Sequence, residues 1–387
     1  MGKIVIYGGT FNPPHKGHTE SAGEVVQQLK PDKLLVIPSG TPPHKSLTGD
    51  TPTGAQRLDM ARLAFASVDG AEVSDVEVAR DGISYTADTL RLLREREPDG
   101  DFTLMIGTDM FLSIEQWKDS DEILRTVSLA VTLRFEDSRD NTLAHAAHLR
   151  DKYGTRVEII ENRVIEVSSS ELRERLENRF GEDFIDDSVY SYIIYNKLYG
   201  AKANLDWLRV RAHAMLNPSR VPHVIGCEQE AERLAVRWGE DINSAREAAI
   251  LHDCTKRLTL EQQLKLCDKY GVVPDELELN SEKLLHSKTA AALAFAEFNV
   301  SDAVREAIAW HTTGRAGMSA LEKIIYLADY IEPTRNFDGV EALRALSYDD
   351  MDKAMVMGLE MSRDDIVSRG ITPHPGTLEA LAELTKL

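Results

Sequence analysis

The chain has 387 residues with a formal net charge of −19, and 42% of them are hydrophobic, which suits two or three globular domains. The acidic balance argues against a nucleic acid partner, because such a surface repels a phosphate backbone. The sequence has no run of about 18 apolar residues, so we do not expect a membrane partner or a membrane span.

The cysteines and the N-terminus predict the compartment. Cys227, Cys254 and Cys267 lack the paired spacing of a metal or disulfide motif. The N-terminus lacks a signal-peptide pattern. Together these features predict a reduced, cytoplasmic protein. The composition leaves the oligomeric state open and is compatible with an oligomer.

The first motif follows a short apolar run, Ile4–Ile6, which predicts a buried strand. The Gly8-Gly9 pair after it lets the backbone approach a ligand closely. If a helix begins between His15 and His18, both imidazoles lie at its N-terminal end. The unpaired N–H groups and positive partial charge at that end suit a phosphate. This stretch therefore predicts a phosphate site.

Strand and helix patterns then alternate. The expected strands are Lys33–Ile37, Glu72–Val78, Phe102–Ile106, Leu129–Leu133 and Val157–Ile160. The expected helices between them include Ala55–Ala66, Tyr85–Arg96 and Asn141–Lys152. This alternation predicts a parallel sheet with both faces covered, and ligands in such sheets lie beyond the carboxyl ends of the strands.

Several polar and aromatic residues follow these strands, and each has two interpretations. Lys45 could supply a charge for a phosphate or carboxylate, or be an ordinary surface lysine. Asp109 could cap the next helix or bind a ligand. Trp117 could stack on a flat ring or fill the core. The run Ser168–Ser170 with Arg173 predicts the start of a helix, and its hydroxyls and amides could also hold a polyphosphate.

The eleven residues from Gly8 to His18, Gly-Gly-Thr-Phe-Asn-Pro-Pro-His-Lys-Gly-His, resemble the signature of the nicotinate-nucleotide adenylyltransferase family. The resemblance covers about residues 1–200. It implies a Rossmann-like nucleotidyltransferase domain of the α/β class. It also implies the reaction, in which ATP with Mg²⁺ and nicotinate mononucleotide give the dinucleotide and pyrophosphate. A rival is transfer to another phosphate acceptor, such as phosphopantetheine.

The same resemblance implies two sets of site residues. ATP would be held by Gly8, Gly9, Thr10, Phe11, His15, His18, Gly107, Asp109, Ser168, Ser169, Ser170 and Arg173. Of these, His15, His18 and Arg173 would act in catalysis. The nicotinate nucleotide would be held by Lys45, Tyr85, Thr86, Trp117 and Arg134. The family usually has Pro-Gly after this arginine, whereas this chain has Phe135-Glu136.

Beyond a seam at residues 200–204 nearly every pattern is helical, which predicts an all-α domain of about eight helices over residues 205–387. The expected helices are Leu205–Leu216, Gln229–Trp238, Ser244–His252, Leu260–Tyr270, Ser281–Glu297, Asp302–Trp310, Ala320–Ile331 and Met351–Ser368.

Metal-ligand residue types recur in this domain. His252 and Asp253 close an apolar helix, where ionisable groups need partners. Four further candidates lie on or beside other predicted helices: His223, His286, His311 and Asp329. Each alone would be read as an ordinary histidine or aspartate, but together with His252 and Asp253 they favour a metal site. Imidazole and carboxylate ligands without a thiolate suit Fe, Mn or Zn, and a shared carboxylate can bridge two ions.

The order His…His-Asp…His…His…Asp is similar to that of the HD superfamily of metal phosphohydrolases. The segments 251–256, 311–315 and 326–333 resemble its YqeK-type family, symmetrical diadenosine tetraphosphate hydrolases that release two ADP. This resemblance implies a two-metal centre, with iron favoured, at His223, His252, Asp253, His286, His311 and Asp329.

By the same resemblance Asp253 would act in catalysis, and Lys256 and Arg315 would face the polyphosphate. Two alternatives for this half stay open: a non-catalytic nucleotide sensor and a generic HD nucleotidase.

Overall fold

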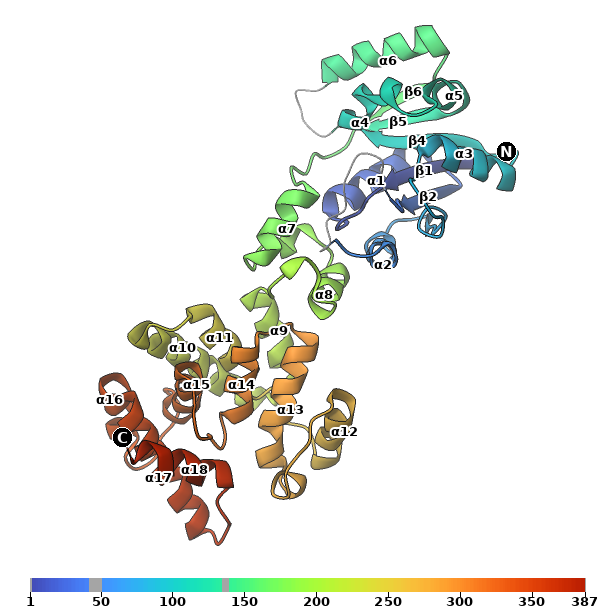
Figure 1. Cartoon of the computed structure of the whole chain (residues 1–387). Coiled ribbons are helices and arrows are strands. Elements are labelled where there is room, and N and C mark those ends of the chain that lie inside the picture. Colours follow the sequence, from blue (N-terminus) through green and yellow to red (C-terminus); the bar gives the residue numbers. More distant parts are fainter. Residues whose placement is uncertain (1, 42–50, 134–138, 387) are drawn as a thin grey trace. The chain divides into compact units, whose positions relative to one another are not determined.

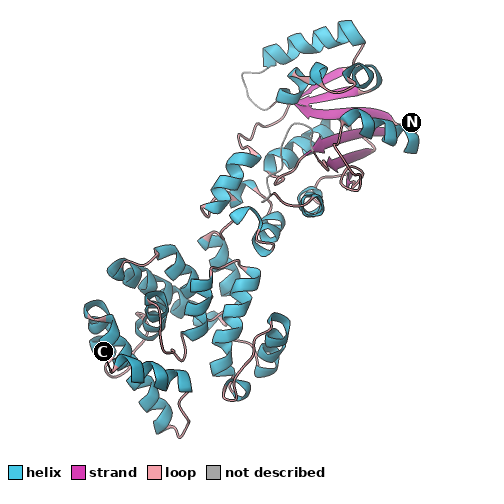
Figure 2. Ribbon diagram, viewed as in Figure 1, coloured by secondary structure: helices cyan, strands magenta, loops and turns pink. Residues whose placement is uncertain are grey.

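The computed structural model describes residues 2–41, 51–133 and 139–386. It divides the chain into two compact units, Met1–Ala201 and Lys202–Leu387 (Figure 1). Among the described residues, strands occur only in the first unit (Figure 2). The predictions for Lys45 and Arg134 fall outside the described residues.

Six parallel strands form the sheet of the first unit, in the order β3-β2-β1-β4-β5-β6. This confirms the parallel α/β prediction. The central strand, β1, pairs with β2 on one side and with β4 on the other. Its pairing with β2 runs from Ile4 opposite Lys33 to Gly9 opposite Pro38. The chain order changes direction between β1 and β4, and nucleotide sites of such sheets lie at that switch point. The strands are β1 Lys3–Gly9, β2 Lys33–Pro38, β3 Ala71–Val73, β4 Asp101–Gly107, β5 Ser128–Thr132 and β6 Val157–Ile160.

The third strand is shorter than its apolar pattern predicts. Its pairing with β2 ends where Val73 lies opposite Val36. Directly after this pair, the Ser74 hydroxyl accepts a hydrogen bond from the Val76 amide at 3.3 Å. Such a local side-chain bond offers the backbone an alternative to the sheet, so the predicted continuation to Val78 forms a turn instead.

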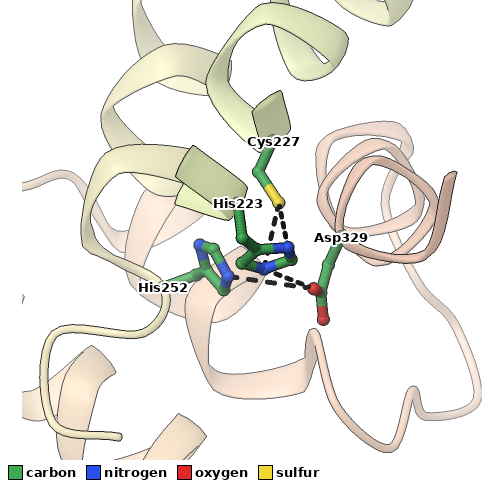
Figure 3. A group of neighbouring side chains, drawn as sticks. All are labelled: His223, Cys227, His252 and Asp329. Carbon is green, nitrogen blue, oxygen red and sulfur yellow. Dashed lines mark hydrogen bonds and ion pairs between the residues drawn. The ribbon is translucent and has the colours of Figure 1, made fainter. Parts of the chain in front are cut away.

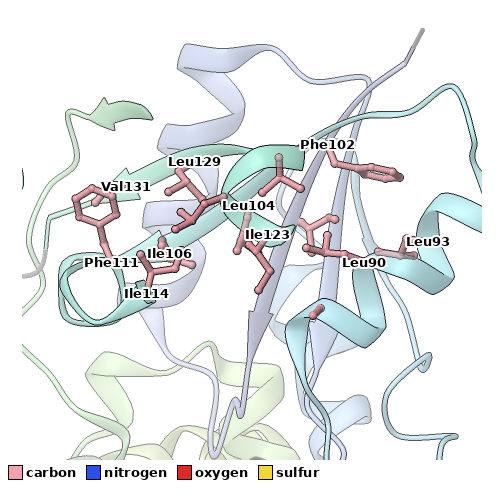
Figure 4. Close-up of a cluster of buried hydrophobic side chains, with 14 of the residues drawn as sticks. Leu90, Leu93, Phe102, Leu104, Ile106, Phe111, Ile114, Ile123, Leu129 and Val131 are labelled. Carbon is pink, nitrogen blue, oxygen red and sulfur yellow. The ribbon is translucent and has the colours of Figure 1, made fainter. Parts of the chain in front are cut away.

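Alternating residues of the central strands build the main core of the first unit (Figure 4). Leu104 and Ile106 of β4 point to the same face because side chains alternate along a strand. They belong to one buried cluster with Leu90 of α3 and Ile123 of α5. Each such side chain contributes about 1.5–3 kcal/mol when fully buried. On the other face Tyr7 packs edge-on against Phe65 of α2, with ring centroids 6.0 Å apart.

The helices of this unit are α1 Lys16–Leu29, α2 Gly54–Phe65, α3 Thr86–Arg96, α4 Thr108–Leu112, η1 Ile114–Gln116, α5 Ser120–Thr126, α6 Arg139–Tyr153, α7 Ser169–Glu177, η3 Glu182–Phe184, α8 Asp187–Tyr195 and η4 Leu198–Gly200.

The second unit has ten α-helices among residues 202–386, two more than predicted. The additional helices are α16 and α18. Helix α10 begins at Val221 rather than at the predicted Gln229, because Pro222 is tolerated in a first turn. None of the described helices combines the length and the apolarity that a membrane crossing requires. The α-helices are α9 Leu205–Met215, α10 Val221–Trp238, α11 Ile242–Leu251, α12 Leu260–Tyr270, α13 Glu282–Glu297, α14 Asp302–Trp310, α15 Ala320–Ile331, α16 Val340–Asp349, α17 Met351–Ser368 and α18 Pro375–Leu384, with short turns η5 Pro218–Arg220 and η6 Glu278–Asn280.

Candidate functional site

In the first unit, His15 and His18 lie together at the start of α1. His15 is the N-cap, in extended conformation, and its backbone N–H donates to Nδ1 of His18 at 3.2 Å. Because Nδ1 accepts, Nε2 of His18 carries the proton and can donate to a phosphate oxygen. The two rings lie 3.8 Å apart at their centroids. A Cβ at Gly17 would lie 3.0 Å from Nδ1 of His15, which is a tight contact, so glycine favours the packing of the His15 ring against this turn.

The N-terminus of α7 is tied to the same loop. Ser168 caps the helix by accepting from the Glu171 amide at 3.1 Å, which confirms the predicted helix start. Ser169 donates through Oγ to the carbonyl oxygen of Pro13 at 3.2 Å. Arg173 donates from Nη1 to the Asn12 carbonyl at 2.7 Å and from Nη2 to Ser170 Oγ at 3.1 Å. Two helix N-termini and a guanidinium therefore meet beside the loop that carries His15.

The remaining predicted ATP residues lie at the ends of β1 and β4. A Cβ at Gly8 would meet no atom within 4 Å, so the backbone is open there. Phe11 is buried and packs edge-on against His18, with centroids 5.2 Å apart. Gly107 is the N-cap of α4, and Asp109 is an exposed residue of its first turn. The capping interpretation of Asp109 is therefore wrong, because the cap position is Gly107.

Arg57 of α2 fixes the loops between these strand ends, although sequence reasoning missed it. Its side chain is only 1% exposed. Nη1 donates to the carbonyl oxygens of Thr10 at 3.0 Å and Ser39 at 2.6 Å, and Nη2 donates to that of Gly40 at 2.8 Å. Burial lowers the pKa of this guanidinium. The loops after β1 and β2 are thus held in place by one buried cation.

Three of the residues predicted for the nicotinate nucleotide are described, and they lie in two neighbouring segments. Tyr85 is the N-cap of α3 and Thr86 its first helical residue. The Lys118 ammonium lies 4.4 Å from the centre of the Tyr85 ring, which brings the segment of Trp117 next to it. Trp117 is partly buried against the core cluster, so filling the core is at least one of its roles.

In the second unit, three histidines are oriented in the same way. Nδ1 of His252, just past α11, donates to the Ala249 carbonyl at 2.7 Å. Nδ1 of His311, just past α14, donates to the Ile308 carbonyl at 2.7 Å. Nδ1 of His286, within α13, donates to the carbonyl of Lys283 at 2.8 Å. A carbonyl oxygen can only accept, so each Nε2 is unprotonated when the ring is neutral, as a metal ligand must be.

These Nε2 atoms converge on Asp253, which is fully buried. Oδ1 of Asp253 lies 3.2 Å from Nε2 of His286 and 3.7 Å from Nε2 of His311. Oδ2 lies 3.5 Å from Nε2 of His252 and 3.9 Å from Nε2 of His223. One carboxylate therefore faces two pairs of imidazoles, one pair with each oxygen.

Figure 3 shows the side chains that lie around His223, which are Cys227, His252 and Asp329. Nε2 of His223 lies 3.0 Å from Oδ1 of Asp329, and its Nδ1 lies 3.0 Å from Oε1 of Glu332. Glu332 accepts from Nδ1, so Nε2 of His223 is also directed at the centre. The thiol of Cys227 lies 3.3 Å from this same Nε2. One ligand atom from each of His223, Cys227, His252 and Asp329 lies within 4.8 Å of the others.

This arrangement fits bound cations. Nε2 of His286 and Nε2 of His311 lie 3.1 Å apart, although both are acceptors in the neutral rings. The buried atoms His252 Nε2 and Asp253 Oδ1 make no hydrogen bond in the described structure. Burial lowers the pKa of His286 to about 4. Burial opposes the ionisation of Asp253, but the facing imidazoles hold its pKa well below the usual range. Burial lowers the pKa of His252, but the facing carboxylates of Asp253 and Asp329 raise it above its usual range. A cation at this centre would therefore displace a proton from His252.

Basic side chains border the centre. Arg220 donates from Nε to Oδ2 of Asp253 at 2.6 Å. The Lys256 ammonium lies 3.3 Å from Oδ1 of Asp253 and 3.1 Å from Nε2 of His286, so it lies beside the centre. Arg315 instead pairs with Glu322 at 2.5 Å, and none of its described contacts reaches the Asp253 carboxylate.

The structure thus brings all six predicted metal-ligand residues together. It adds Cys227, Glu332 and Arg220, which sequence reasoning missed. A signal was available for Cys227, since residues four apart share one helix face. The predicted helix Gln229–Trp238 contains neither His223 nor Cys227, so the pair becomes visible only once α10 is seen to begin at Val221.

Comparison with known proteins divides the chain in the same way. A family model for cytidylyltransferase-like proteins matches residues 6–175, and one for the HD domain matches residues 220–334. A probable nicotinate-nucleotide adenylyltransferase of Clostridium acetobutylicum is 32% identical over 200 residues, which are 51% of this chain and 100% of that protein. Its counterpart in Bacillus licheniformis is 34% identical, over 51% of this chain and 99% of that protein. One crystal structure, also from Clostridium acetobutylicum, is described as a predicted HD superfamily hydrolase involved in NAD metabolism. It is 35% identical in sequence and covers 48% of this chain and 99% of its own, with a TM-score of 0.47.

Proposed function

The first half of this chain belongs to the nicotinate-nucleotide adenylyltransferase family, and from this premise we propose that residues 1–201 join ATP and nicotinate mononucleotide. A phosphate oxygen of the mononucleotide attacks the α-phosphorus of ATP. The bond from that phosphorus to the bridging oxygen breaks, and pyrophosphate leaves. The attacking oxygen is already charged, so the reaction needs no general base.

The residues beside α1 supply positioning and charge for this transfer. Nε2–H of His18 and the N-terminal amides of α1 can donate to phosphate oxygens, and Arg173 adds a fixed cation. Mg²⁺ bound with ATP neutralises further phosphate charge. The observation that carries this proposal is the convergence of the His15–His18 helix start with the Ser169–Arg173 helix start.

A product assay tests this half. We expect the full chain to form nicotinate adenine dinucleotide and pyrophosphate from ATP and nicotinate mononucleotide. Pantetheine phosphate, offered in competition, should not be adenylylated. Preference for pantetheine phosphate would replace the proposal with its rival.

For the second unit we propose a two-ion phosphohydrolase that cleaves diadenosine tetraphosphate into two ADP. The single observation that carries it is the Asp253 carboxylate, whose two oxygens face different histidine pairs. His223, His252 and Asp329 would hold one cation with Oδ2, and His286 and His311 a second with Oδ1. Two cations held there would supply charge that polarises a phosphate and lowers the pKa of a water nucleophile. Iron is the favoured metal by family resemblance, and the nitrogen and oxygen ligands suit it.

Two basic residues of this unit are candidates for contact with the polyphosphate. Lys256 lies at the centre and can contact a phosphate oxygen. Cleavage by water of the central anhydride bond would put one phosphate pair, and one adenosine, on each product. Arg315 pairs with Glu322 in the structure. Its contact with the polyphosphate therefore stays a prediction.

The test for this unit measures metal content and ADP release on the same sample. We expect two metal ions per chain and two ADP per diadenosine tetraphosphate. Binding of the dinucleotide by metal-loaded protein without cleavage would favour the sensor. Equal cleavage of many nucleotides would favour a generic nucleotidase.

A further inference from the structure

Cys227 lies among the side chains of the first cation position. It follows His223 by one helical turn on α10, and its Sγ lies 3.3 Å from His223 Nε2 (Figure 3). Cys227 is 1% exposed, so its thiol points into the unit and not into solvent. The other two cysteines, Cys254 and Cys267, join no potential ligand group among the described residues.

The distances match those of a shared ion. Bonds of roughly 2.0–2.3 Å from one tetrahedral ion to nitrogen, oxygen and sulfur put the ligand atoms about 3.3–3.6 Å apart. The sulfur of Cys227 lies 3.3 Å from His223 Nε2, which in turn lies 3.0 Å from Asp329 Oδ1. The fourth ligand atom, Nε2 of His252, lies 4.0 Å from Asp329 Oδ1, and all four ligand atoms lie within 4.8 Å of one another. A single ion can therefore bind all four atoms once the side chains draw closer together.

We propose that Cys227 is a thiolate ligand of the cation held by His223, His252 and Asp329. This inference rests on the proposed two-ion site and adds a ligand to it. The thiolate makes the two positions unequal, because the Oδ1 side of Asp253 has only imidazole and carboxylate ligands. A soft sulfur ligand favours Zn²⁺, Fe²⁺ or Co²⁺ over Mg²⁺ or Mn²⁺ at the first position.

Binding involves no oxidation or reduction. The S–H bond of Cys227 breaks, a sulfur–metal bond forms, and the proton passes to solvent. One proton more is therefore released per chain than in a variant without this thiol. The two ions also differ spectroscopically, since only one of them has a sulfur ligand.

Cobalt replacement tests the proposal on the full chain. We expect wild-type protein with two Co²⁺ to show the near-ultraviolet sulfur-to-cobalt charge-transfer band of one thiolate. The band should vanish in Cys227→Ser and persist in the matched double variant Cys254→Ser, Cys267→Ser. Calorimetry in buffers of different ionisation enthalpy should find one proton fewer released by Cys227→Ser.

The outcomes separate this inference from the function on which it rests. Two bound Co²⁺ without a charge-transfer band in wild type would overturn the thiolate ligand and leave the two-ion site standing. Wild-type protein that binds no Co²⁺ would overturn the two-ion site itself. If Cys227→Ser fails to fold, the ¹¹³Cd resonances of wild type still decide. One resonance shifted by a sulfur ligand supports the proposal, and two resonances of nitrogen and oxygen sites contradict it.

Discussion

Arg173 of α7 donates a hydrogen bond to the carbonyl oxygen of Asn12, across 161 positions of sequence, at 2.7 Å. The contact holds the loop that leads into His15 against the start of α7. Arg173 thereby has a structural role as well as the predicted role at the phosphates of ATP. A lysine could keep the charge but not the fork of donors.

Arg173→Lys should lower kcat/KM for ATP by roughly 10-fold to 100-fold, because the bidentate geometry is lost while the charge remains. Steady-state kinetics of pyrophosphate release measures this. Arg175→Lys is the matched control, since Arg175 lies on the same helix and pairs with Glu171 at 2.6 Å. Wild-type kinetics in Arg173→Lys would show that the fork does not matter.

His18→Ala should reduce turnover by about 100-fold or more and change ATP affinity much less. The reason is that a donor aimed at developing phosphate charge acts mainly in the transition state. Turnover from product formation and ATP affinity from calorimetry separate the two effects. His148→Ala, on the outer helix α6, should leave both unchanged. A His18→Ala protein with full turnover would remove His18 from the catalytic residues.

Arg57→Met should destabilise the first unit by about 3 kcal/mol. The change leaves three carbonyl oxygens without their charged donor, and bonds to charged groups are worth about 1.5–3 kcal/mol each. Urea unfolding followed by a probe in this unit measures the loss. Arg62→Met on the same helix removes only an exposed pair with Asp59, so its effect should stay within about 0.5 kcal/mol. Equal effects of the two changes would contradict the structural role of Arg57.

Gly226→Ala should weaken the first cation position without unfolding the second unit. A Cβ there would lie 2.5 Å from Oε2 of Glu332, which orients His223 from behind. Loss of such an outer partner typically lowers metal affinity about 10-fold to 100-fold. Competition with a chelator measures the affinity. Gly358→Ala in α17 is the control, because its Cβ would have ordinary contacts from 3.5 Å outward. Unchanged affinity in Gly226→Ala would mean that Glu332 has no such role.

Local sequence patterns predicted most of the fold. The strand expected at Val157–Ile160 and the helices at Leu260–Tyr270 and Ala320–Ile331 have the predicted bounds. In these segments the spacing of apolar residues and, for the two helices, the capping residues predict the same bounds that tertiary packing imposes. The pattern failed where local chemistry competed with it, as at Ser74, and it missed the first two turns of α10, which begins at Val221.

The candidate sites were predictable to a different degree. Motif order pointed to the residues that now surround Asp253, although they come from five separate helices or helix ends. Arg57 and Glu332 act through contacts with distant segments, which no local pattern encodes. Lys45 and Arg134 stay predictions, because they lie outside the described residues.

The number of metal ions per chain tests the central claim most directly, since that claim makes Asp253 the shared ligand of two cations. Elemental analysis of metal-loaded protein should give two ions for wild type, one for His286→Ala and none for Asp253→Asn. His148→Ala, on α6 of the first unit, should keep both. Two ions retained in Asp253→Asn, or a single ion in wild type, would contradict the bridged centre.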